Sequence, residues 1–262
     1  MKIVMWIGNE SNQKALANKV NQEFPIAGIV TETRASKSRI TFKKLIEKFI
    51  EKLFLSSIDQ AWISMKKKYE KQFPNYPSCP LIDVENINCE ETLKFTNDVQ
   101  PDIILVSGTR MIREKLLALN PKIGILNLHT GLSPFVKGGP NCTNWCIANR
   151  EFNLIGNTIM WIDAGIDTGN IFCTEKTEIQ QSNNLIDIHT KVMDHAHQLY
   201  VRTLCAIKNG DSNNVKQSEL GEGKTYFTKD WGLKQKIALV KNMRHFKTIV
   251  KDQVEIKTIK IP

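Results

Sequence analysis

The fold class is decided by two apolar stretches near the start of the chain, Lys2-Ile-Val-Met-Trp-Ile7 and Ile26-Ala-Gly-Ile-Val-Thr31. Each is short and bounded by turn-forming residues, as is typical of a buried strand, and residues 15–24 between them are typical of a helix. Strand, helix and strand in this order open a doubly wound α/β fold. We therefore predict an α/β protein with a Rossmann-like, mostly parallel sheet flanked by helices.

Outward from this unit, the apolar run Ile103-Ile-Leu-Val106 predicts another buried parallel strand. Residues 42–69 have apolar side chains at helical spacing, which predicts one long helix or two helices joined near Ser56-Ser57. Residues 130–141 are rich in Gly and Pro and are predicted as a loop. We place further strands at 81–84, 123–128, 158–162 and 171–179, and further helices at 90–97, 112–119, 143–149 and 185–207. The less regular tail suggests one domain over 1–210 and a small C-terminal extension over 211–262.

The 262-residue chain has a net charge of +9, and this charge is concentrated in two segments. Residues 34–72 hold 11 basic and 4 acidic side chains, and residues 221–262 hold 10 and 4, which leaves a net −4 for the rest. Such segments are most often solvated helix faces and a basic tail; the alternative is attraction of an anionic substrate. Because the charge lies outside the presumed core, we expect no nucleic-acid partner.

Other features indicate a cytoplasmic protein. No run of 18 uncharged apolar residues is present, so we expect no membrane span. Residues 1–8 resemble a strand and lack the features of a signal peptide. The six cysteines are scattered, and only Cys142 and Cys146 lie close in sequence, without a second pair at zinc-site spacing. We expect reduced thiols and no metal.

The first segment that indicates chemistry is Gly124-Ile-Leu-Asn-Leu-His-Thr-Gly-Leu-Ser-Pro134. Asn127 and His129 stand at the carboxyl end of a predicted parallel strand, which is the edge where ligands bind in open α/β sheets. Residues two apart on a strand share a face, so both side chains can point at one reacting atom. The Gly/Pro loop that follows is suited to form a cavity rim.

The second segment, Gly156–Gly169, is a predicted strand followed by a loop that holds Asp163 and Asp167. A carboxylate beside an imidazole orients the ring and favours its charged form. An Asn amide and a cationic His can together stabilise an oxyanion, which acyl transfer to an amine requires. Each motif alone is weak, since a lone His after a strand is usually structural; their combination is more specific.

Together the two segments resemble the N10-formyltetrahydrofolate-dependent formyltransferase family. The resemblance rests on Asn127-Leu-His129, Leu-Ser-Pro134, Lys137-Gly-Gly139, Gly156-x-Thr158 and Asp163-x-Gly-Ile-Asp-x-Gly169. It is clear over about residues 100–175, weaker at the first strand, and fades over 34–78 and beyond about 210.

The resemblance implies an N-formyltransferase with Asn127, His129 and Asp167 as its catalytic residues. N10-formyltetrahydrofolate would be the co-substrate and no metal would be needed. Its pteridine would contact Arg110, Met111 and Ile112 on one side, with Asp163 and Asp167 on the other. The acceptor would contact Thr130, Lys137, Gly138 and Gly139; many relatives carry Pro or Asn where this chain has Thr130.

Several acceptors fit such an enzyme. In Gly8-Asn-Glu-Ser-Asn12, Glu10 places a carboxylate where glycinamide ribonucleotide transformylases have a Gly-rich phosphate loop. A methionyl-tRNA formyltransferase would need a sizeable C-terminal barrel, and a deformylase a further N-terminal domain. The segment with Trp145 is most similar to the sugar-nucleotide N-formyltransferases. We expect an amino-deoxysugar nucleotide as acceptor, in synthesis of a cell-surface polysaccharide such as lipopolysaccharide, and a possible homodimer by analogy. A basic nucleic-acid-binding protein on the same fold is the non-enzymatic alternative.

Overall fold

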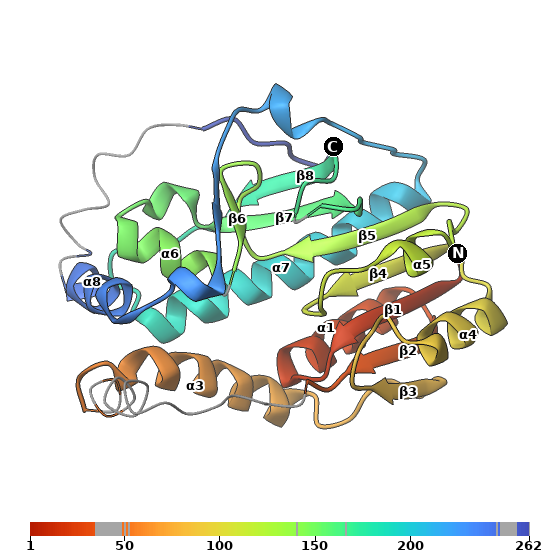
Figure 1. Ribbon diagram of the computed structural model, residues 1–262, viewed down its shortest axis with the longest axis horizontal. Helices are drawn as coiled ribbons and strands as arrows, with labels where there is room; N and C mark the ends of the chain where they lie inside the picture. The colour runs from red at the N-terminus through yellow and green to blue at the C-terminus, as the bar shows by residue number, and fades with distance from the viewer. Residues whose placement is uncertain are drawn as a thin grey trace.

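Five neighbouring parallel strands form the centre of the fold (Figure 1). The computed structural model describes residues 1–34, 49, 51, 53–139, 141–165, 167–244, 246 and 256–261. Its main sheet has the order β3-β2-β1-β4-β5-β7-β8, and β7 runs antiparallel to both neighbours. The strands are β1 (Ile3–Gly8), β2 (Ile26–Glu32), β3 (Leu81–Val84), β4 (Ile103–Ser107), β5 (Gly124–His129), β7 (Gly156–Trp161) and β8 (Ile171–Lys176). The predicted mostly parallel sheet is confirmed.

Helices cover both faces of this sheet, which explains why the central strands are apolar throughout. All residues of β1 and β4 are buried. Alternate residues of β1 face opposite sides: Ile3, Met5 and Ile7 pack with α1 (Ser11–Glu23) and α7 (Leu185–Lys208). On the opposite face of the sheet, Val4 and Trp6 pack with residues of α4 (Glu90–Val99) and α5 (Glu114–Leu117).

Helix α3 (Ser56–Gln72) lies outside α1 and α7 (Figure 1). Its residues Met65 and Tyr69 are fully buried against Ala15 of α1 and Met193 of α7. The helix predicted over 42–69 is therefore confirmed from Ser56 onward, and residues 42–48 lie outside the described residues.

Residues 136–149 and the C-terminal part of the chain pack together beside the main sheet (Figure 1). Strands β6 (Val136–Gly138) and β9 (Lys224–Tyr226) pair in parallel, and α6 (Cys142–Asn149) packs on α8 (Leu233–Arg244). The prediction of an uninterrupted loop over 130–141 was wrong at β6. Its three residues form a strand because β9 supplies the partner, and local sequence carries no sign of a partner so distant.

Residues 211–244 contribute to the same packing as the preceding domain. Trp145 of α6 stacks on Tyr226 with ring centroids 4.4 Å apart. The side chain of Asn242 donates hydrogen bonds to the carbonyls of Ile147 and Ala148, each 2.9 Å long. Leu239 is fully buried in this cluster. No helix among the described residues is long and apolar enough to cross a membrane.

Candidate active site

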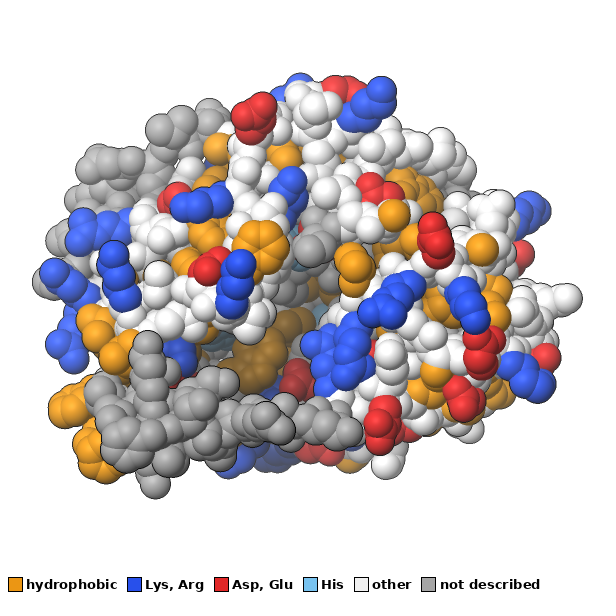
Figure 2. All heavy atoms as spheres, in the orientation of Figure 1, with side chains coloured by type: hydrophobic (Ala, Val, Ile, Leu, Met, Phe, Trp, Pro, Cys, Tyr) orange, Lys and Arg blue, Asp and Glu red, His pale blue; other side chains and the backbone are white. Residues whose placement is uncertain are grey.

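A cavity of about 680 Å³ opens at the edge of the sheet where the parallel strands end. Figure 2 shows the corresponding face of the molecule, which is hollowed near its middle, with Lys and Arg side chains beside the hollow. Both motifs that the sequence singled out reach this cavity, since Asn127, His129 and Asp167 all line it. A cavity of this volume is in the range of small-molecule sites.

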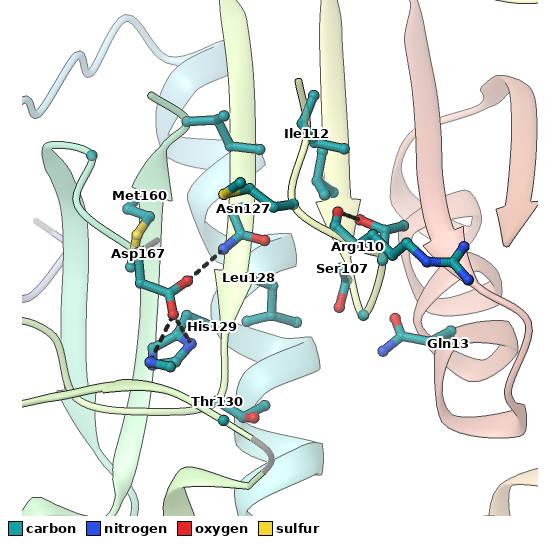
Figure 3. Close-up of a pocket in the computed structure, with 18 of the residues that line it drawn as sticks. Gln13, Ser107, Arg110, Ile112, Asn127, Leu128, His129, Thr130, Met160 and Asp167 are labelled. Atoms are coloured by element: carbon teal, nitrogen blue, oxygen red, sulfur yellow. Dashed lines mark hydrogen bonds and ion pairs between the residues drawn. The ribbon is translucent and has the colours of Figure 1, made fainter. Parts of the chain in front are cut away.

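The three residues converge on one point (Figure 3). Asn127 and His129 project from the same face of β5, and Asp167 lies in the loop after β7. The Asn127 amide donates to Asp167 Oδ1 over 3.5 Å. His129 Nδ1 lies 3.4 Å from Asp167 Oδ2. The structure therefore brings together the three residues that the sequence singled out.

His129 is held as a cation in a buried position. Burial disfavours the charged form of the ring. The Asp167 carboxylate, the Cys142 side chain and the Val136 carbonyl favour the charged form and outweigh burial, so that the pKa of His129 is raised to about 10. His129 Nε2 lies 3.0 Å from the Val136 carbonyl oxygen and 3.6 Å from Cys142 Sγ. A β-carbon at Gly131 would collide with Nε2, so this position requires glycine.

The Asp167 carboxylate is fixed by contacts from distant parts of the chain. Its Oδ2 accepts a hydrogen bond of 3.0 Å from the Gly138 amide. Asp167 has φ of 50°, in the left-handed region that non-glycine residues rarely adopt. The Gln217 amide holds this conformation by donating to the carbonyls of Asp167 and Gly169, over 2.7 and 2.9 Å.

One side of the cavity is formed by the loop after β4. Residues 106–112 line it; Ile112 is buried and Met111 is 53% exposed. Glu32 holds the backbone of this loop. Its carboxylate accepts a 2.8 Å hydrogen bond from the Arg110 amide and forms a 2.7 Å ion pair with the Arg110 guanidinium. The Arg110 guanidinium is thus paired with Glu32, while its side chain stays 40% exposed and lines the cavity.

The loop after β7 lines the cavity across from the loop after β4 (Figure 3). Asp163 Oδ1 accepts hydrogen bonds from the Gly165 amide and the Thr168 hydroxyl, over 2.9 and 2.7 Å. Asp163 therefore shapes its own loop. A flat ligand with polar edges would fit between this loop and residues 108–112.

Another part of the cavity lining combines residues that were expected at the site with residues from other segments. Thr130, Gly138 and Gly139 line it as predicted, whereas Lys137 is not among the lining residues. Further lining residues come from α1, α3, α7 and the C-terminal part of the chain: Glu10, Asn12, Gln13, Trp62, Met193, Tyr226, Phe227 and Thr228. Among the described residues, no group of His, Cys, Asp and Glu side chains could hold a metal ion.

Comparison with known proteins agrees with this geometry. A formyl transferase family model matches residues 1–204. The chain belongs to the formyltransferase family.

Among the curated relatives of this chain is a methionyl-tRNA formyltransferase from Clostridium botulinum, 31% identical over 198 residues, which cover 72% of this chain and 60% of the relative. The chain spans about 40 to 60% of the length of the first curated relatives it matches. A sugar N-formyltransferase structure from Shewanella has a TM-score of 0.59 at 12% identity, covering 92% of this chain and 88% of that one. An N-formyltransferase from Helicobacter canadensis in complex with folinic acid and dTDP-3-aminofucose has a TM-score of 0.58 at 15% identity, covering 93% and 81%.

Glu32, Gln217 and Phe227 are among the residues at this site that were not found from the sequence. Glu32 stands at the end of β2 in an apolar run, and Gln217 and Phe227 lie in the irregular tail. A charged residue that ends a buried strand was a signal for Glu32. Gln217 and Phe227 carried none, because their role depends on a distant chain segment.

Proposed function

We propose that this protein transfers the formyl group of N10-formyltetrahydrofolate to the primary amine of an amino-deoxysugar nucleotide. The observation that carries the proposal is the Asn127–His129–Asp167 cluster, which lies at the middle of one continuous cavity. One side of that cavity suits a flat donor. The other is walled by aromatic side chains and suits a small acceptor.

The donor side supports a folate. Loop backbone around Arg110 and Ile112 offers peptide edges for a pteridine, and this loop is held in place from behind by Glu32. Buried Ile112 and the exposed side chain of Met111 supply apolar contact. The Helicobacter canadensis relative is described in complex with folinic acid, itself a formylated folate.

In the proposed reaction the acceptor amine attacks the formyl carbon. A C–N bond forms, a tetrahedral oxyanion develops, and the bond from carbon to N10 then breaks, releasing tetrahydrofolate. The Asn127 amide and the positive charge of His129 stabilise the oxyanion. Both ring nitrogens of His129 already face acceptors, Asp167 and Val136, so a direct hydrogen bond to the oxyanion requires Nε2 to leave Val136. The Asp167 carboxylate accepts the proton that the amine loses, directly or through water, and this proton is passed on to N10 as the carbon–N10 bond breaks, so that tetrahydrofolate leaves as the neutral amine.

The acceptor side supports a nucleotide. Phe227 is 45% exposed and lines the cavity, so its ring is available to contact a base. Solved sugar N-formyltransferases have nearly the same extent as this chain, with 92% of this chain and 88% of the Shewanella protein aligned. The dTDP-3-aminofucose of the Helicobacter canadensis complex is an acceptor of this class.

The second candidate is formylation of methionyl-tRNA. The sequence relatives favour it, at 31% identity over 198 residues.

A turnover assay tests both candidates. The purified protein is given N10-formyltetrahydrofolate with amino-deoxysugar nucleotides, glycinamide ribonucleotide or charged initiator tRNA, and tetrahydrofolate release is followed. We expect turnover with an aminosugar nucleotide that is lost in His129→Ala and retained in Gly232→Ala, a glycine exposed far from the cluster. Turnover with charged tRNA alone would show that tRNA, and not an aminosugar nucleotide, is the acceptor. No turnover with any acceptor would overturn the proposal.

A further inference from the structure

The N-terminal end of α1 forms one wall of the cavity, through Glu10, Asn12 and Gln13. A helix N-terminus with open backbone amides is normally suited to bind a phosphate or another anion. The side chains at this end give it a different chemistry.

Two of the polar groups at the start of α1 are engaged by α3. Glu10 precedes the helix, does not cap it, and receives an ion pair of 3.2 Å from Lys66. The Ser11 hydroxyl donates to the Lys66 carbonyl over 2.8 Å. A carboxylate thus borders the cavity at the helix end, and Lys66 is paired with it. The Arg34 guanidinium also lines the cavity, but it is engaged by Glu32 and the Gly108 carbonyl. These features oppose the binding of a second anion there.

The next two residues carry polar atoms that lack a partner within the described part of the chain. These atoms are Asn12 Oδ1 and Gln13 Oε1, and the two residues are only 2% and 8% exposed. Both line the cavity, and Figure 3 shows the Gln13 amide beside Ser107 at the cavity. Buried oxygens of this kind are costly unless a donor reaches them, so they fit a ligand with hydroxyl or N–H groups.

An aromatic ring completes this wall. Trp62 of α3 lines the cavity, and its ring is held edge-on against His189 of α7, with centroids 5.8 Å apart and an interplanar angle of 85°. Met193 of α7 lies on the same wall. An indole face beside hydrogen-bond acceptors matches a sugar ring, which presents C–H groups on one face and hydroxyls at its rim.

We propose that the α1–α3 wall, formed by Glu10, Asn12, Gln13, Trp62 and Met193, is a subsite for an uncharged, hydroxyl-bearing ring of the acceptor. Ring hydroxyls donate to Asn12 Oδ1 and Gln13 Oε1, the apolar ring face covers Trp62, and Glu10 keeps phosphate groups away from the helix end. The inference rests on the proposed function and adds where the acceptor binds. The sugar ring lies against α1 and α3, and the phosphates of the nucleotide lie elsewhere in the cavity.

Steady-state kinetics on the full chain test the subsite. We expect Gln13→Met to raise the KM for the aminosugar nucleotide about tenfold or more, because the ring hydroxyl then loses the side-chain oxygen that accepts its hydrogen bond. The KM for N10-formyltetrahydrofolate should stay within about twofold, since lost binding at one subsite leaves the donor contacts intact. Gln22→Met, an exposed residue of the same helix, is the matched control and should behave as the wild type. Trp62→Ala should raise the acceptor KM similarly, and Trp62→Phe should restore most of the loss.

A binding experiment separates failure of the subsite from failure of the proposed function. The methyl glycoside of an amino-deoxysugar, without nucleotide, is tested by saturation-transfer NMR, with inorganic phosphate as competitor. Binding that is abolished in Gln13→Met and insensitive to phosphate supports the subsite even where no formyl transfer to sugar nucleotides occurs. The subsite is overturned by an unchanged acceptor KM in Gln13→Met, by absence of glycoside binding to the wild type, or by phosphate displacement that Lys66→Met weakens.

Discussion

Asp167 occupies the position on which the catalytic cluster depends. Its carboxylate faces Asn127, His129 and the Gly138 amide, while its backbone is held at φ of 50° by Gln217. A residue in a rarely populated conformation persists only where its surroundings enforce it, and such residues concentrate at functional sites.

Replacing Asp167 by Asn should reduce kcat about 10²- to 10⁴-fold, the usual contribution of a general base. It should also change the pH dependence. In the wild type the pKa of His129 is raised to about 10, so the ring stays charged from pH 6 to 9. Without the carboxylate, burial lowers that pKa, and the residual rate should fall as the pH rises through neutrality. A residual rate with the wild-type pH profile would contradict this role.

Gly131→Ala should abolish the proposed activity although it replaces none of the three proposed catalytic residues. The added methyl group would collide with His129 Nε2 and approach the Val136 carbonyl, so the ring must move. A displacement of about 1 Å can cost about 10² in rate. Gly232→Ala is the control, since its new methyl would make only an ordinary contact with Gln235. Equal activity of the two variants would show that the ring has room to adjust.

At the scale of elements, Glu32 joins the ends of β2 and β4 to the loop at Ile87. Its fully buried carboxylate accepts hydrogen bonds from the amides of Ile87 and Arg110 and ion pairs from Arg34 and Arg110. Burial raises the pKa of Glu32, but these hydrogen bonds outweigh it and hold the pKa below its usual range. The carboxylate therefore fixes the loop that we assign to the donor.

We expect Glu32→Gln to raise the KM for N10-formyltetrahydrofolate more than the KM for the acceptor, and to destabilise the fold by about 1–3 kcal/mol. Glu85→Gln removes an exposed charge from the neighbouring loop and should do neither. Because the folded-state pKa is lowered, the stability that Glu32 contributes is present above about pH 4.5 and lost as the pH falls through the folded pKa. The difference in Tm between wild type and variant should shrink accordingly in acid.

Some helices and strands of this fold could be predicted from the sequence, and others could not. Strands β1, β2, β4 and β5 were placed within about two residues, because buried parallel strands are continuous apolar runs. Asn127 and His129 were singled out because they stand at a strand end, and the resemblance to the formyltransferase family then selected Asp167 from the two carboxylates of its loop. Strand β6 and helix α8 were missed, since β6 exists only through pairing with β9 and α8 through packing on α6.

At the scale of the whole molecule, residues beyond 210 complete the apolar cluster around α6. Leu239→Ala should therefore destabilise the whole protein by about 2–5 kcal/mol, the usual cost of truncating a fully buried leucine. Ile237→Ala on the same helix is 50% exposed and should change stability by about 0.5 kcal/mol or less. Chemical denaturation should show one transition in each variant. A separate early transition in Leu239→Ala would indicate that 211–262 unfolds as an independent unit.

The parallel pairing of β1 with β4 also bears on how the chain acquires its structure during synthesis. Ile3 pairs with Ile103, so the central strand leaves the ribosome about a hundred residues before one of its two neighbours exists. Until then one edge of β1, a fully apolar strand, is uncovered, and such edges associate readily with other chains. Nascent chains of this protein should therefore need protection by chaperones over that interval, and their folding should be slow compared with that of helical proteins of the same length.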